Sequence, residues 1–455
     1  MPGSPVTSGA INIDGRMVAP VTTADLPLTH ESLAHLMQGL SLKQHTHGVF
    51  DWELAASRYD YRRDQKRQIA AGGSGTLADG SGTGWQTLAA KGTWRPPLAG
   101  SAHVADFGLQ QESYRLQYVT SPVSGNWLVD TPGVPISDTG GESQLRSAYA
   151  QDAWTISPHW KTVVGLRAEQ WAANGGHTRI LNAAPIVNTS WPTHHESHVS
   201  PKAALAWQWQ HDTVVKFSAG RAVRFPTVAE LYGATSTTNA LFINDPNLKP
   251  ERSWTRELSA EKDWGKSMLR LTGFSEDTHD ALYSQTTFDA AANRNVTRVQ
   301  NVAHIRTTGI ELAYSGTDVG TSGLDVNASV TYADSQIKEN AGFVAVPGDT
   351  LGKRQPNIPR VRAAALAIYR WNERWSTSVG ARYSGPQFRT LDNSDVNGFT
   401  YMGVSRFFVV DLRTRWRVDE HWSAAFGINN VNNDKYWNFH PYPQRTFVAE
   451  LKVDL

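Results

Sequence analysis

The sequence predicts an all-β protein and, within that class, a transmembrane antiparallel β-barrel. Three observations support this: apolar and polar residues alternate with a period of two, the alternating segments are long, and aromatic residues gather at their ends. The clearest segment places on one face Phe408, Val410, Leu412, Thr414, Trp416 and Val418, and on the other Asp411, Arg413, Arg415 and Arg417. A face this polar fits water outside a soluble sandwich or water inside a wide barrel.

Segment length and aromatic placement distinguish these two folds. Residues 50–61, 323–337 and 376–388 form segments of about ten residues or more, long enough for a tilted strand to cross a membrane and long for a sandwich. Tryptophans flank short turns, as Trp154 and Trp160 do, which is typical of a barrel wall that meets lipid headgroups. The sequence therefore favours the membrane barrel over a soluble β-protein.

Composition narrows the possible functions. The chain has 43 Lys and Arg against 42 Asp and Glu, so it lacks the basic surplus of a protein that binds nucleic-acid phosphates. It contains no cysteine, which excludes disulfides, thiolate metal sites and a cysteine nucleophile. No run of about eighteen apolar residues is present, which excludes helical membrane spans. Residues 1–14 show neither a basic start nor an apolar segment, so we expect no export signal there.

The pattern divides the chain into two parts. Residues 1–28 are rich in Pro, Gly, Ser and Thr and predict an irregular N-terminal segment, whereas residues 29–455 predict the barrel. Long turn-rich clusters alternate with short breaks, which predicts long loops at one end of the barrel and tight turns at the other. The long clusters are residues 71–84, 121–141, 174–197, 233–250, 339–359 and 387–403. We count about sixteen or seventeen strands.

One long loop carries a pair of motifs. It contains Val223-Arg224-Phe225-Pro226 and, after a polar spacer, Asp245-Pro246-Asn247-Leu248. Prolines at both motifs favour an ordered loop between two strands. The motifs resemble the paired Phe-Arg-Ala-Pro and Asn-Pro-Asn-Leu boxes of TonB-dependent outer-membrane receptors, each slightly altered.

Further blocks resemble the same family and occur in its order along the chain. They are residues 200–205, 301–312, 353–360, 409–413 and 427–436. The resemblance implies a twenty-two-stranded barrel whose lumen is closed by an N-terminal plug domain. Because the chain shows no plug and about five strands fewer than that, we expect a form truncated at its N-terminus. It ends in Leu455, where the family usually ends in an aromatic residue.

The resemblance also implies a function. We expect an outer-membrane receptor for TonB-energised uptake of a scarce ligand, by default an iron-siderophore complex, with copper or cobalamin as alternatives. The implied partners are this ligand, the TonB complex through the missing plug, and outer-membrane lipid; no nucleic acid, cofactor or catalytic residue is expected. Residues 233–244 contain no histidine, which argues against haem. A soluble all-β binding or adhesive protein and an outer-membrane enzyme remain as alternatives.

Candidate ligand contacts lie in the expected loops. Two belong to the loop with the paired motifs and four are aromatic residues near the C-terminus, where they could form a ligand platform or part of the extracellular girdle. They are Arg224, Tyr232, Tyr401, Trp437, Phe439 and Tyr442.

Histidines and lumenal charges form the remaining candidates. His194, His195 and His198, beside Glu196, could bind a transition metal, or they are solvated side chains of a long loop. His45 and His47 receive the same interpretation. We also expect four charged strand residues to face the lumen and solvate the wall, namely Arg306, Glu311, Asp411 and Arg413.

Overall fold

The computed structural model describes residues 9, 11–13, 16–18, 27–69, 74–97, 102–181, 186–233, 235–236, 240–242, 244–289, 294–341, 349–400 and 403–454. These residues form strands, turns and one short helix. The elements are β1 (Ile11–Ile13), β2 (Arg16–Val18), β3 (Leu28–Gln44), β4 (Phe50–Ile69), β5 (Gly75–Asp79), β6 (Gly84–Trp94), β7 (His103–Val123), β8 (Ser137–Ser157), β9 (Trp160–Ile180), β10 (Val187–Ser190), β11 (His194–Gln210), β12 (Thr213–Arg224), α1 (Val228–Tyr232), β13 (Thr235–Ser236), β14 (Ala240–Phe242), β15 (Glu251–Asp263), β16 (Ser267–Asp289), β17 (Arg294–Gly316), β18 (Leu324–Glu339), β19 (Val361–Arg370), β20 (Trp375–Ser384), β21 (Phe407–Arg417), β22 (Trp422–Asn429), β23 (Trp437–Asn438), β24 (His440–Pro441) and β25 (Thr446–Val453).

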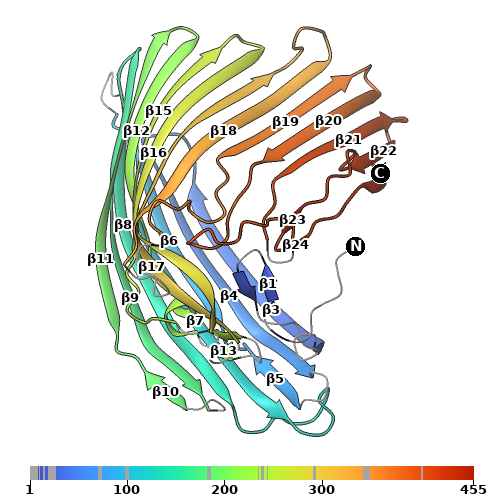
Figure 1. The fold of residues 1–455 in the computed structure, drawn as a ribbon. Coiled ribbons are helices and arrows are strands. Elements are labelled where there is room, and N and C mark those ends of the chain that lie inside the picture. Colours follow the sequence, from blue (N-terminus) through green and yellow to red (C-terminus); the bar gives the residue numbers. More distant parts are fainter. Residues whose placement is uncertain are drawn as a thin grey trace.

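The strands make one curved antiparallel wall in chain order (Figure 1). Within the described ranges, the barrel order contains twenty-one strands, of which β5, β10, β13 and β14 are short pieces of two to five residues. The other seventeen have eight residues or more, and their long neighbours pair antiparallel. The predicted antiparallel barrel and the predicted number of strands are therefore confirmed.

The two faces of the wall differ as the alternation predicts. On β9, Val164 and Leu166 are more than half exposed, whereas Trp171 and Ala173, of opposite parity, are buried on the other face. Exposed apolar side chains recur around the barrel, for example Leu109. A soluble sandwich would bury such residues between two sheets, so this arrangement contradicts that alternative and fits a wall whose outer face meets lipid.

Tryptophans of neighbouring strands meet beside the short turns. Trp160 stacks on Trp207 with ring centroids 5.6 Å apart, and Trp375 lies 6.1 Å from Trp416. All four are exposed on the outer face, as predicted for an aromatic girdle. No helix among the described residues is long and apolar enough to cross a membrane.

Two of the long turn-rich clusters are shorter loops than predicted. β7 continues to Val123 before β8 begins at Ser137, and β9 continues to Ile180 before β11 begins at His194. These extensions keep the backbone ladder while losing the apolar alternation. Polar side chains such as Ser121 and Thr178 share the buried positions there with Val123 and Ile180, so period-two hydrophobicity no longer marks the strand.

The expectation that Arg306 and Glu311 face the same side is wrong. On β17 Arg306 pairs with Asp277 and shares its parity with the exposed Ile310 and Leu312, whereas Glu311 has the opposite parity. Residues five positions apart on a regular strand lie on opposite faces. Arg306 therefore faces outward and donates its Nε to the Asp277 carboxylate at 2.9 Å.

One neighbouring pair of strands differs from the rest. In strand order β25 is followed by β3, as in a closed barrel. Ladder pairs join β22 to β25 and β3 to β4, but within the described residues no ladder pair joins β25 to β3. All eight residues of β25 and fifteen of the seventeen in β3 are exposed. We call this place the seam.

The N-terminal segment contains more structure than predicted. Where residues 1–28 are described, β1 and β2 form a short hairpin in which Ile11 faces Val18. The wall itself begins at Leu28 in β3, one residue before the predicted start of the barrel.

Candidate functional site

The loop with the paired motifs joins β12 to β15 and turns back into the barrel. The two strands pair to their ends, where Arg224 faces Glu251. Beyond Arg224 the chain forms α1, which begins with a capping box: the Thr227 hydroxyl accepts the Glu230 N–H, and the Glu230 carboxylate accepts the Thr227 N–H. This cap satisfies N–H groups that so short a helix otherwise leaves open.

The apolar face of α1 packs on strands that are not adjacent to β12, the strand that leads into the helix. α1 reaches across β11 to lie against β7, β8 and β9. Val228, Leu231 and Tyr232 are buried there with Trp171 and Leu248. Because Trp171 belongs to the face of β9 that points away from the exposed Val164 and Leu166, the loop lies on the inner wall of the barrel.

Tyr232 occupies the closest contact in this packing. Its side chain is 1% exposed, and burial raises the pKa of its hydroxyl. A Cβ on Gly176 would lie 2.3 Å from Cζ of the ring, so only glycine allows this approach. The Thr178 hydroxyl also donates to the Tyr232 carbonyl at 2.7 Å. Tyr232 was predicted as a ligand contact, but the structure places its ring in the protein interior.

Arg224, the other predicted contact in this loop, links the strand ends to the helix cap. Its Nη1 donates to both carboxylate oxygens of Glu230, at 3.2 and 3.3 Å, and its Nε lies 3.8 Å from Glu251. Glu251 in turn accepts the Leu282 N–H at 3.0 Å. The Arg224 side chain is still 43% exposed, so part of the guanidinium faces a cavity.

That cavity of about 610 Å³ lies between the loop and the inner wall. Its aromatic lining comes from four separate segments: Trp85 of β6, Tyr114 of β7, Trp171 of β9 and Phe225 of the loop. Trp171 and Phe225 are stacked with centroids 5.5 Å apart. Glu112 and Arg224 add one charge of each sign. We call this space the aromatic cavity; such rings offer planar faces to aromatic or cationic groups.

The candidate histidines lie beside the aromatic cavity, in β11 and not in a loop. His194, Glu196 and His198 share the inner face, and His195 has the opposite parity. Both His194 Nε2 and His198 Nε2 are 3.3 Å from the Glu196 carboxylate. The rings of His194 and His198 contact Trp171 and Phe225. The structure thus brings two of the three predicted metal ligands together and separates the third.

The C-terminal aromatic candidates form a different cluster. The Ser405 N–H donates to the Trp437 carbonyl in β23, and the Trp437 N–H donates to the Ser405 hydroxyl. The Arg389 guanidinium lies over the Phe439 ring at 4.6 Å. Tyr442 stacks on Tyr436, whose ring contacts that of Phe407 at a tilt of 32°. Tyr401 lies outside the described residues. These contacts join the loop after β20 to the loop after β22, so Trp437, Phe439 and Tyr442 belong to a loop cluster separate from Arg224.

Sequence reasoning missed the residues that line the aromatic cavity. Trp85, Tyr114 and Trp171 are spread over 87 positions of the printed sequence. Their parity was a usable signal, because in register Trp85 faces Tyr114 and each has the parity opposite to an exposed leucine of its own strand, Leu88 and Leu109. What the sequence did not contain is the inward turn of the loop that roofs them.

Comparisons with known proteins agree with this fold. The family model described as "TonB dependent receptor-like, beta-barrel" matches residues 20–431. No curated protein sequence matches the chain. The similar solved structures include the ferric citrate transporter FecA, at 15% identity and a TM-score of 0.69, covering 92% of this chain and 61% of that one.

Two other solved structures show the same likeness. The copper transporter OprC has 16% identity and a TM-score of 0.67, with 93% of this chain and 66% of that chain covered. The siderophore receptor PiuA from Acinetobacter baumannii has 16% identity and a TM-score of 0.64, with 91% and 62% covered. The chain therefore spans less than two thirds of the length of each of these structures. The antiparallel wall, the inward loop and the family match over residues 20–431 lead to one conclusion: the chain belongs to the TonB-dependent receptor-like β-barrel family.

Proposed function

We propose that the chain forms the barrel of an outer-membrane receptor that captures a scarce metal chelate, by default an iron-siderophore complex, for uptake energised by TonB. The observation that carries the proposal is the aromatic cavity, which the inward loop forms against the inner wall. Family membership supports the location and the transport role, and it supports binding and conformational change in place of covalent catalysis.

The lining of the aromatic cavity suggests the chemistry of its ligand. Trp85 and Phe225 offer rings, and Trp85 stacks on Tyr59 with centroids 4.4 Å apart, which extends the aromatic surface along the wall. Flat apolar surfaces favour a chelator with aromatic groups. Arg224 and Glu112 can each pair with a polar substituent of the ligand.

The neighbouring histidines favour a ligand that contains a metal ion. His194 and His198 lie two residues to either side of Glu196 on the same face, and they touch the rings of Trp171 and Phe225, respectively. Imidazole and carboxylate groups suit iron and copper. We propose that His194 and His198 contact the metal-bearing part of the chelate, whereas His195 does not.

Ligand binding by the full chain in detergent micelles tests the proposed function. Equilibrium dialysis against ferric chelates of the catecholate, hydroxamate and citrate classes should detect binding of at least one class. Trp85→Leu should weaken that binding about tenfold, which corresponds to ~1.4 kcal/mol, because it removes a cavity ring.

Trp254→Leu is the matched control for this measurement. Trp254 is 38% exposed and Trp85 is 39% exposed. Trp254, however, lies on the outer face of β15, the same face as the exposed Leu258. Its replacement should leave chelate binding within a factor of two. Failure of all three classes to bind, or equal losses for the two variants, would contradict the proposal.

A further inference from the structure

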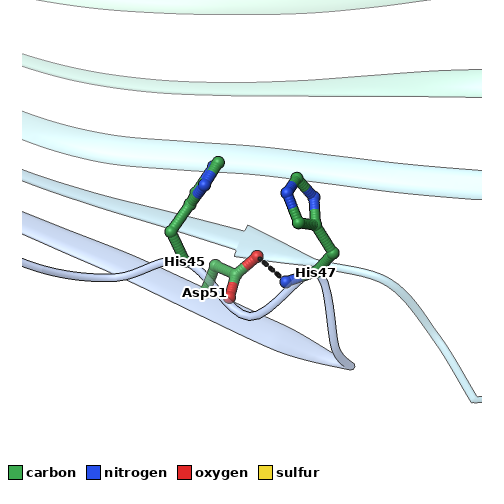
Figure 2. Close-up of side chains that lie close together, drawn as sticks. All are labelled: His45, His47 and Asp51. Atoms are coloured by element: carbon green, nitrogen blue, oxygen red, sulfur yellow. Dashed lines mark hydrogen bonds between the residues drawn. The ribbon is translucent and has the colours of Figure 1, made fainter.

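Another group of ionisable side chains lies in the hairpin turn between β3 and β4. One ligand atom each of His45, His47 and Asp51 lies within 4.8 Å of the other two, and this is the one such group of three in the described part of the chain. The imidazole centroids are 4.6 Å apart. Figure 2 shows both rings projecting to the same side of the turn, with Asp51 beside them.

This turn belongs to the rim opposite the aromatic cavity. The rim consists of the short connections between strands, which bond to one another: the Arg95 N–H donates to the Val49 carbonyl, and the Thr155 N–H to the Ala102 carbonyl. Arg224 and the inward loop lie at the other end of β12. A site at His45 and His47 is thus independent of the proposed ligand cavity.

Asp51 holds the turn in one conformation. Its Oδ1 accepts the Thr46 N–H at 2.7 Å and the Thr46 hydroxyl at 3.1 Å, and its Oδ2 accepts the His47 N–H at 3.2 Å. Arg95 Nη1 donates to the same Oδ2 at 2.8 Å and to the Gly48 carbonyl at 2.9 Å. These bonds maintain His47 at φ 58°, a conformation that non-glycine residues adopt only when something fixes it.

The same bonds decide what kind of ion the turn can bind. The carboxylate of Asp51 already accepts four hydrogen bonds and its charge is balanced by Arg95, so it has no free oxygen for Ca²⁺ or Mg²⁺. The two imidazoles are exposed and are the ligands that Zn²⁺, Ni²⁺ and Cu²⁺ prefer. Small side-chain rotations bring their nitrogens from within 4.8 Å to the roughly 3.3 Å expected of two ligands on one ion.

We propose that His45 and His47 chelate one divalent transition-metal ion of the Zn²⁺, Ni²⁺ and Cu²⁺ class at this rim. Water completes the coordination shell. Asp51 acts as a positioning residue, since it sets the backbone from which His47 reaches the ion. Of the two alternatives that the sequence leaves open for these histidines, a metal site and solvated side chains, this proposal takes the first.

Calorimetric titration of the EDTA-treated full chain with Ni²⁺ in detergent micelles tests the site. His45→Ala and His47→Ala should each weaken one binding event at least tenfold, because a chelate loses one of its two protein ligands. His211→Ala is the control: this histidine is 94% exposed at another short turn, and its replacement should leave the affinity within a factor of two. Affinities within a factor of two of the parent for His45→Ala or His47→Ala, or an equal loss for His211→Ala, would overturn the proposal.

The role of Asp51 has a separate test. Asp51→Asn should weaken Ni²⁺ binding about 10- to 100-fold, as for other residues that orient metal ligands. The electron paramagnetic resonance spectrum of Cu²⁺ bound to the Asp51→Asn variant should still show two coordinating nitrogens. The spectrum of the His45→Ala variant should show one. Thr46→Val, a milder change that removes only the hydroxyl donor, should weaken binding about two- to tenfold. Unchanged affinity in both the Asp51 and Thr46 variants would rule out positioning.

Discussion

The Tyr232 ring lies directly on the backbone of Gly176, and this contact determines where the inward loop rests. The ring comes from α1, which follows β12, and the glycine comes from β9; β11 separates β12 from β9 in the sheet. A methyl group at position 176 would overlap the ring, with Cβ 2.3 Å from Cζ. The roof of the aromatic cavity therefore depends on the absence of one side chain.

Gly176→Ala should displace α1 from the inner wall. Overpacking of this kind costs about 1–3 kcal/mol, and the loop can relieve it by moving because α1 is only five residues long. Hydrogen exchange followed by mass spectrometry should show faster exchange of residues 228–232. Gly273→Ala is the control, since nothing lies within 4 Å of a Cβ there; equal exchange in the two variants would contradict the argument.

Parity explains the fate of the candidate histidines at this same scale. His194 and His198 differ by four positions and face the lumen together, and His195 cannot join them because successive residues of a strand point to opposite faces. The sequence-based prediction treated the three histidines as one cluster because it placed them in a loop, where side chains do not alternate between two faces. Once β11 begins at His194, the cluster has to split.

Two short turns show how one local motif repeats at the scale of an element. In the turn between β19 and β20, Asn372 Oδ1 accepts the N–H groups of Arg374 and Trp375. In the turn between β21 and β22, Asp419 Oδ1 accepts the N–H groups of His421 and Trp422 in the same way. The side chain in each case replaces a turn bond of the backbone. Only the aspartate can titrate.

Acid should therefore weaken one turn and leave the other unchanged. The N–H groups of Trp422 and His421 hold the pKa of Asp419 below its ordinary value of 3.8, so its contribution to stability is present above that value and is lost as pH falls through the lower, folded pKa. Asp419→Ala should lower the thermal midpoint at pH 7, with a gap to the parent that narrows in acid.

Asn372→Ala provides the comparison for this measurement. It should lower stability by about 1 kcal/mol at every pH, because an amide acceptor does not change its charge. Circular dichroism melts of both variants between pH 7 and acid would measure the two gaps. A gap for Asp419→Ala that stays constant while the parent remains folded would contradict the titration argument.

At the scale of the whole molecule, the seam is the part of the wall whose strands are most exposed. β16 and β17 share the longest ladder, which runs from the Ser267 and Gly316 pair to the Asp289 and Arg294 pair. β25 and β3 are neighbours in the barrel order, but among the described residues ladder pairs link β3 to β4 and β25 to β22 only. Backbone groups on an unpaired edge bond to water or to another strand.

Amide exchange should reveal this difference directly. Amides of β16 and β17 in the central part of the wall should exchange slowly, and the amides of β3 and β25 that point away from β4 and β22 should exchange fast. Measuring the full chain in micelles by hydrogen exchange tests both at once, with β16 and β17 as the internal reference. Protection of β3 and β25 equal to that of β16 would mean that a ladder closes the seam.

The sequence by itself determined those features of the protein that follow a periodic pattern of residues. Alternation, segment length and tryptophan placement predicted the barrel and its number of strands, because every residue of a membrane strand must face either lipid or the interior. The paired motifs around Arg224 and Phe225 predicted the family. Prediction failed where polar side chains occupy covered positions of a strand, as Ser121 does in β7 and His194 does in β11, since no apolar alternation remains there.

Only the tertiary structure decided which residues far apart in the sequence come into contact. The aromatic cavity joins Trp85, Tyr114, Trp171 and Phe225 through a loop that turns inward to place Tyr232 on Gly176. The sequence offers His45 and His47 as possible metal ligands, and only the tertiary structure shows that Asp51 and Arg95 fix the backbone of their turn. A periodic pattern shows which face of a strand a residue occupies. Contacts between distant strands depend instead on how the whole chain folds into the barrel, so no single stretch of sequence predicts them.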